Sequence, residues 1–163
     1  MTTAVKEERT PNKKQQECID NIKGKYLVLA GPGTGKTFTI IERIKNMLKE
    51  LNHKGTFIMA HMGYTFKWDM IIEEFKSYDV YFDLALSLGT LKMYGKDYPL
   101  MDEDTLLKFI DTFGSERILF ATDCPWMNQK ESVDVFNSYK RISEKDRENI
   151  LYKNALRLLN IKG

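Results

Sequence analysis

Apolar residues alternate along the chain between two patterns. Short runs of consecutive apolar residues predict buried strands. Between these runs, apolar residues recur every three or four positions, which predicts amphipathic helices. Strands alternating with helices predict an α/β fold of parallel strands with covering helices. The predicted strands span residues 26–30, 56–61, 80–83 and 117–123, and we expect them to lie consecutively with right-handed crossovers.

The helical pattern covers most of the remaining chain. The first predicted helix begins at Pro11 and ends at Gly24, because proline is tolerated in a first turn and glycine ends helices. Asp102 and Ser143 are predicted helix N-caps. Residues 84–100 are interpreted mainly as a long polar connection. The other predicted helices span about residues 35–51, 66–78, 101–113, 129–137 and 143–160.

The composition is that of an ordinary globular protein. The chain has 163 residues, a net charge of +2, 42% hydrophobic and 29% charged residues, which predicts one domain or one and a fragment and gives no support to nucleic-acid binding. Cys18 and Cys124 fit no metal or redox spacing, which favours reduced thiols. No signal peptide or membrane-spanning run is recognised, so we expect a soluble, cytoplasmic protein without membrane contact.

A glycine-rich stretch follows the first predicted strand and opens a helix. It reads Gly31-Pro32-Gly33-Thr34-Gly35-Lys36-Thr37. Glycines let backbone N–H groups turn toward an anion at a helix N-terminus. Lys36 would reach the outer phosphates, and the Thr37 hydroxyl would hold Mg²⁺. The motif predicts a site for ATP with Mg²⁺ at Gly31, Gly33, Thr34, Gly35, Lys36 and Thr37. Alternatively, the glycines serve only a strand-to-helix turn, and Ala30 departs from the strict pattern.

Residues 11–48 resemble the start of a superfamily 1 DNA helicase of the UvrD/Rep kind. The resemblance rests on Asn12-Lys13-Lys14-Gln15-Gln16-Glu17 placed shortly before the glycine-rich stretch. It implies that Gln15 hydrogen-bonds the adenine edge, although Gln15 could also be a solvated helix residue. Beyond Leu51 we find no match to the helicase's Asp-Glu pair, arginine fingers or second motor domain. A helicase motor and DNA binding are therefore poorly supported.

Residues from about 54 to the C-terminus look like the last three βα units of a metal-dependent amidohydrolase-type (β/α)₈ barrel. The segments that carry the resemblance are Ala60-His61-Met62-Gly63, residues 114–126 and residues 150–159. The resemblance implies that His61 ends the sixth strand and binds metal or substrate. It also implies that Asp123 ends the eighth strand, binds a divalent metal such as Zn²⁺ and accepts a proton from the attacking water. Strand C-termini are where barrel enzymes place their chemistry.

This metal set is incomplete in the sequence. A hydrolytic site needs several ligands that converge on one ion, and the chain has two histidines, of which His53 is expected in a loop. Asp83, at the end of a predicted strand, could join His61 and Asp123. Each of the three could instead have a structural role, such as a turn at a strand end. Asp83 or Asp123 could also orient magnesium beside the glycine-rich loop.

These patterns predict a fusion of residues 1–51, a helicase-type nucleotide-binding segment, with residues 52–163, the C-terminal part of an amidohydrolase-type barrel. Nucleotide binding is the favoured activity. The alternatives are a metal-dependent hydrolase that uses His61 and Asp123, and a recombined fragment without a cellular role. A partial barrel leaves sheet edges uncovered, so we expect a homo-oligomer or another chain to cover them.

Overall fold

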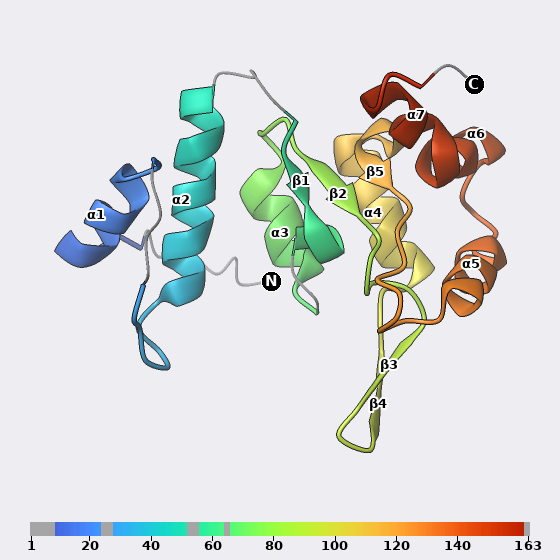
Figure 1. Ribbon diagram of the computed structural model, residues 1–163, viewed down its shortest axis with the longest axis horizontal. Coiled ribbons are helices and arrows are strands. Elements are labelled where there is room, and N and C mark those ends of the chain that lie inside the picture. The colour runs from blue at the N-terminus through green and yellow to red at the C-terminus, as the bar shows by residue number, and fades with distance from the viewer. Residues whose placement is uncertain (1–8, 24–27, 52–55, 64–65, 162–163) are drawn as a thin grey trace, which may run out of the picture. The chain divides into compact units, whose positions relative to one another are not determined.

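The computed structural model describes residues 9–23, 28–51, 56–63 and 66–161. The chain divides into two compact units that span Met1–Gly55 and Thr56–Gly163 and are coloured from blue to red along the chain in Figure 1.

The described part of the first unit contains two packed helices and a glycine-rich loop that precedes the second. Helix α1 (Lys13–Asp20) begins with a capping box, in which the Asn12 side chain accepts from the Gln15 N–H and the Gln15 side chain accepts from the Asn12 N–H. Helix α2 (Lys36–Leu51) follows the glycine-rich loop. The Asn46 side chain donates to the Ile19 carbonyl at 3.1 Å, which ties α2 to α1. Both helices predicted for this region are observed, although α1 ends at Asp20 and not at the predicted Gly24.

The strand predicted at residues 26–30 is not observed where it can be checked. Tyr26 and Leu27 lie outside the described residues, and residues 28–30 carry no strand pairing. A strand needs a neighbouring strand to satisfy its backbone groups, and the described residues of this unit contain no other strand. The predicted first strand is therefore contradicted at residues 28–30, and three of the four predicted parallel strands are observed in the described part of the chain.

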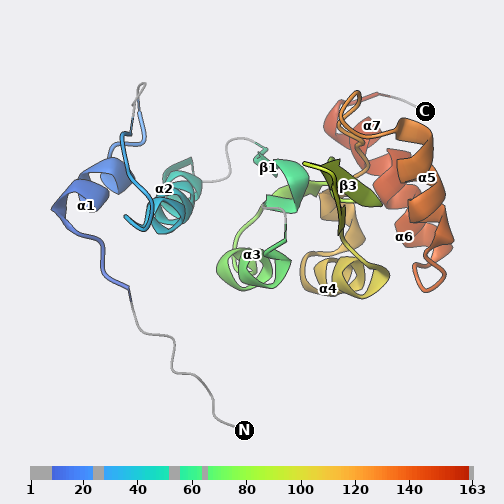
Figure 2. The same cartoon turned by 90° about the horizontal axis from the view of Figure 1, so that it is seen from below.

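The second unit is built on a parallel sheet in the order β1-β2-β5, which confirms the predicted order of these strands. The strands are β1 (Ile58–Met59), β2 (Tyr81–Asp83) and β5 (Ile118–Leu119). Helices α3 (Trp68–Phe75) and α4 (Glu103–Phe113) cover one face of the sheet, as Figure 2 shows. Phe82 of β2 meets Phe109 and Phe113 of α4, with ring centroids 5.1 and 4.7 Å apart. The predicted α/β fold is confirmed.

The strands are shorter than the apolar runs that predicted them. After β1 the chain enters a 3₁₀ segment, Ala60–Gly63, in which His61 and Met62 have positive φ angles of 55° and 53°. Left-handed backbone does not continue a strand, so β1 stops before His61. Strand β5 stops at Leu119, because the next residue, Phe120, pairs with no strand. Its N–H donates instead to the Ile150 carbonyl in the C-terminal helical region, at 2.9 Å.

A hairpin was missing from the predictions. Strands β3 (Thr90–Met93) and β4 (Lys96–Pro99) pair antiparallel and extend away from the sheet in Figure 1. The turn residues Tyr94 and Gly95 have φ angles of 52° and 71°, as the tight turns favoured in hairpins require. The hairpin lacks a run of buried apolar residues, so its sequence resembles a polar connection.

Three helices and a π-helical turn complete the chain. Helix α5 (Gln129–Ser138) matches its prediction. The single helix predicted at residues 143–160 is divided into α6 (Glu144–Glu148), a π-helical turn (Asn149–Lys153) and α7 (Asn154–Leu158). Both predicted N-caps are confirmed, since Asp102 accepts from the Thr105 N–H and Ser143 from the Asp146 N–H.

The π-helical turn covers the outer edge of β5. The Asn154 N–H bonds to the Asn149 carbonyl, five residues back, while the Ile150 carbonyl accepts from Phe120. The buried Asn154 side chain donates to the carbonyls of Ser115 and Ile118, each at 2.7 Å. The backbone groups on this edge are therefore satisfied within the chain.

Candidate functional site

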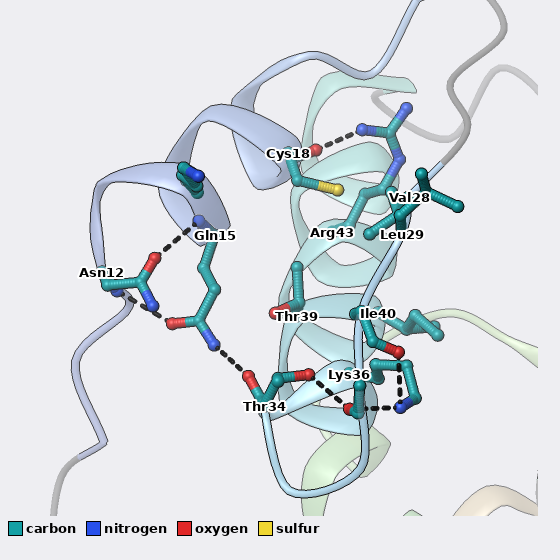
Figure 3. A pocket seen from close by; sticks show the side chains of 13 residues that line it. Asn12, Gln15, Cys18, Val28, Leu29, Thr34, Lys36, Thr39, Ile40 and Arg43 are labelled. Carbon is teal, nitrogen blue, oxygen red and sulfur yellow. Dashed lines mark hydrogen bonds between the residues drawn. The ribbon is translucent and has the colours of Figure 1, made fainter.

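A cavity of about 670 Å³ lies in the first unit, between α1, the glycine-rich loop and α2. Figure 3 shows side chains from all three segments around it. Its polar and basic walls come from Asn12, Lys14, Gln15, Thr34, Lys36, Thr39 and Arg43. Its other walls come from Cys18, Val28, Leu29, Ala30, Gly31 and Ile40. The described lining residues include three basic side chains and no acidic one.

Lys36 is turned toward its own loop. Its Nζ donates to the Ala30 carbonyl at 3.1 Å and to the Gly31 carbonyl at 2.7 Å, and the Thr34 hydroxyl donates to the Gly31 carbonyl at 2.8 Å. These contacts hold the ammonium group at the start of α2, where the helix dipole also favours an anion. A phosphate that takes the place of these carbonyls would gain a charge-assisted bond from Lys36.

Gln15 connects the helix cap to the loop. Its Oε1 accepts from the Asn12 N–H at 2.8 Å, and its Nε2 donates to the Thr34 carbonyl at 3.0 Å. The approach depends on Gly35, whose φ angle is 82° and where a Cβ would lie 2.8 Å from Gln15 Nε2. An amide has two donor hydrogens and two acceptor lone pairs, so Gln15 keeps one of each for a ligand.

The structure brings some of the predicted site residues together and leaves others apart. Gln15, Gly31, Thr34 and Lys36 line the cavity, whereas Gly33, Gly35 and Thr37 are not among its lining residues. The motif did not indicate Lys14 and Arg43, which also line it. Arg43 follows Lys36 by seven residues and so shares its helix face, which is the signal that could have found it.

The predicted residues of the second unit lie at or after the ends of the strands. Asp83 ends β2, and its Oδ1 accepts from the His61 N–H at 3.0 Å and from the Ala85 N–H at 3.1 Å. Asp123 follows β5 and has a positive φ angle of 61°, and its carbonyl accepts from the Trp126 N–H at 2.8 Å. The described contacts thus give Asp83 a role in holding the turn after β1.

The second unit does not present a complete metal site. Among the described residues, no three His, Cys, Asp or Glu side chains converge so that they could hold a metal ion. Catalytic zinc sites use three protein ligands, so the described His, Cys, Asp and Glu side chains do not by themselves form such a site. Metal ligation by His61 and Asp123 stays a prediction. Asp83 and Asp123 also share no sheet with residues 28–30, which pair with no strand in the described part of the first unit.

Comparison with protein-family models identifies the family to which most of the chain belongs. Residues 51–161 match the model of the family described as amidohydrolase. The chain belongs to the amidohydrolase family. In this amidohydrolase chain, residues 11–67 also match the model of the UvrD/REP helicase N-terminal domain. The predicted amidohydrolase resemblance is confirmed, and the helicase resemblance is matched over a minority of the chain.

The relatives of this amidohydrolase chain are longer proteins. A 2-amino-3-carboxymuconate-6-semialdehyde decarboxylase of Caenorhabditis elegans is 41% identical over 61 residues, which are 37% of this chain and 15% of that protein. The crystal structure of 2,6-dihydroxybenzoate decarboxylase from Rhizobium is similar over 95% of this chain and 50% of its own, with a TM-score of 0.55 and 20% identity.

A third relative shows the same partial coverage. A dihydroxybenzoic acid decarboxylase from Polaromonas sp. JS666, solved with bound manganese and 2-nitroresorcinol, is similar over 94% of this chain and 48% of its own, with a TM-score of 0.53 and 24% identity. At these identities the solved structures show the fold alone, which is that of amidohydrolase-type barrels. This chain spans about half the length of the solved relatives.

Among the described helices, none combines the length and the apolar character that a membrane span requires.

Proposed function

We propose that the first unit binds a nucleotide through its phosphates. The observation that carries the proposal is the cavity whose walls include Lys36, the glycine-rich loop and Gln15, with basic side chains and no described acidic one. Lys36 would exchange the Ala30 and Gly31 carbonyls for phosphate oxygens, which are the stronger, charged acceptors. The similarity to a helicase N-terminal domain over residues 11–67 supports the same ligand class.

The base would lie toward α1. Gln15 keeps one donor and one acceptor beyond its bonds to Asn12 and Thr34. Adenine offers an acceptor at N7 beside a donor at N6, the pair that an amide can bind at both ends. Val28 and Ile40 supply apolar surface for the ring. ATP is accordingly the first ligand to test.

The experiment is isothermal titration calorimetry of the full chain with ATP. Lys36→Ala should weaken binding about tenfold or more, because a hydrogen bond to a charged group contributes roughly 1.5–3 kcal/mol. Lys49→Ala is the matched control, since Lys49 lies on the same helix, is exposed and does not line the cavity. The absence of heat with ATP, or equal affinity in Lys36→Ala, would disprove the proposal.

A second candidate is metal-dependent hydrolase or decarboxylase chemistry in the second unit. It is favoured by the membership of the amidohydrolase family and by the 41% identity to a decarboxylase over 61 residues. His61 and Asp123 would hold the divalent metal. Because the described donor set does not reach three converging ligands, we derive no reaction from it.

A further inference from the structure

Three of the described residues that line the cavity of the first unit are basic. Lys14 comes from α1, while Lys36 and Arg43 come from α2. Lys36 donates to two loop carbonyls, and one of the partners of Arg43 is the Cys18 carbonyl. A nucleotide polyphosphate offers the same kind of acceptor with a full negative charge.

The acidic residues in the described part of this unit lie outside the cavity lining. None of the four among its described residues, Glu17, Asp20, Glu42 and Glu50, lines the cavity. Two of them have partners of their own: Asp20 accepts from the Gln16 side chain at 2.7 Å, and Glu42 pairs with Lys45 at 3.0 Å. The cavity therefore lacks a described carboxylate that could face a cation.

Magnesium needs a donor set that the described lining residues of this cavity do not offer. In phosphate-loop enzymes Mg²⁺ is held by a loop hydroxyl together with an acidic side chain, in octahedral oxygen coordination. The predicted hydroxyl is that of Thr37, an exposed residue that is not among the lining residues. A dication placed among three basic side chains would also be repelled by them. These residues do not fit a bound Mg²⁺.

We infer that this cavity binds its nucleotide as the metal-free polyphosphate, with Lys14, Lys36 and Arg43 supplying the positive charge that Mg²⁺ would otherwise bring. The inference rests on the proposed nucleotide-binding function and specifies the form of the ligand. Free ATP carries more negative charge than its magnesium complex, so the cationic wall favours the free form.

The test is calorimetry of the full chain with ATP in two buffers, one with excess Mg²⁺ and one with EDTA. The affinity in EDTA should equal or exceed the affinity in Mg²⁺. Binding that needs Mg²⁺, with a loss of about tenfold or more in EDTA, would overturn the inference and leave nucleotide binding standing. Absence of binding in both buffers would overturn nucleotide binding itself, and the inference with it.

A matched pair of variants and one single variant sharpen the result. Lys14→Ala should weaken binding in EDTA by several-fold, whereas Lys13→Ala, an exposed neighbour outside the cavity, should not. Thr37→Val removes only the hydroxyl predicted to hold Mg²⁺ and should leave the affinity unchanged in both buffers. A loss in Thr37→Val that occurs in Mg²⁺ alone would show that the metal is held by this side chain and would overturn the inference.

Discussion

Asp83 occupies a position typical of a metal ligand, at the end of a strand, but its observed contacts are hydrogen bonds to the backbone. Its Oδ1 accepts from the His61 and Ala85 N–H groups at 3.0 and 3.1 Å. His61 needs this partner because its left-handed backbone, with φ 55°, takes it out of the strand ladder. The carboxylate therefore fixes the turn after β1 to the end of β2.

This role predicts a difference between two substitutions. Asp83→Asn keeps an acceptor oxygen and should change the free energy of unfolding little, whereas Asp83→Leu leaves two N–H groups without this acceptor and should cost about 1–3 kcal/mol. Denaturant unfolding measures the difference. The same samples, loaded with Zn²⁺ and then desalted, are assayed for metal. If Asp83→Asn loses both stability and zinc that the unaltered chain retains, Asp83 is a ligand and metal-dependent chemistry gains support.

Local motifs identified only part of the cavity in the first unit. Gly31, Thr34 and Lys36 could be predicted because the loop's own sequence specifies their positions. Arg43 could have been found from its seven-residue spacing to Lys36 on α2, whereas Lys14 joins them through the packing of α1 against α2, which no local pattern encodes. The motif predicts Thr37 as well, yet Thr37 is exposed and is not among the lining residues. Sequence spacing gives the loop, and tertiary packing decides which neighbours complete it.

At the scale of elements, helices were easier to predict than strands. The caps Asp102 and Ser143 specify where α4 and α6 begin. Strand length depends on partners, so β5 stops where Phe120 bonds to Ile150 and not where its apolar run ends. The π-helical turn was not predicted, and in the structure its Ile150 carbonyl accepts from the Phe120 N–H, a group outside the helix.

The end of α5 provides a pH-dependent contact between elements. The Tyr139 hydroxyl donates at 2.5 Å to the Met101 carbonyl, just before α4. Burial of the hydroxyl raises the pKa of Tyr139 from 10.0 to about 12, and the negative charges of Asp102 and Glu103 contribute smaller increases. Between these values the unfolded chain releases the proton while the folded chain retains it, so stability from this group falls as the pH rises.

Below pH 10, Tyr139→Phe should therefore lower the free energy of unfolding by about 1 kcal/mol. The difference in this free energy between the variant and the unaltered chain should narrow as the pH approaches 12. Denaturant midpoints measured across this range test the expectation. Tyr94→Phe is the control, because Tyr94 is 90% exposed at the tip of the hairpin. A constant difference at all pH values would show that the Tyr139 proton is not linked to folding.

At the scale of the whole molecule, the parallel sheet has two unlike edges. The outer edge of β5 is covered by the Ile150 carbonyl and the Asn154 side chain. In the described part of the chain, β1 pairs with β2 alone, and Ile58 is 46% exposed. The solved relatives are about twice as long as this chain. An unpaired edge is a template for association, so β1 is where we expect a second copy to bind.

Sedimentation velocity over a range of micromolar concentrations tests this self-association. The unaltered chain should show a concentration-dependent dimer. Ile58→Lys should shift it toward monomer, because a lysine on an edge strand opposes pairing with another chain. Ile161→Lys makes the same change at a residue that is 53% exposed and outside the sheet, and it should leave the dimer intact. A monodisperse monomer at every concentration would contradict the expectation, and equal dimerisation of both variants would place the interface away from β1.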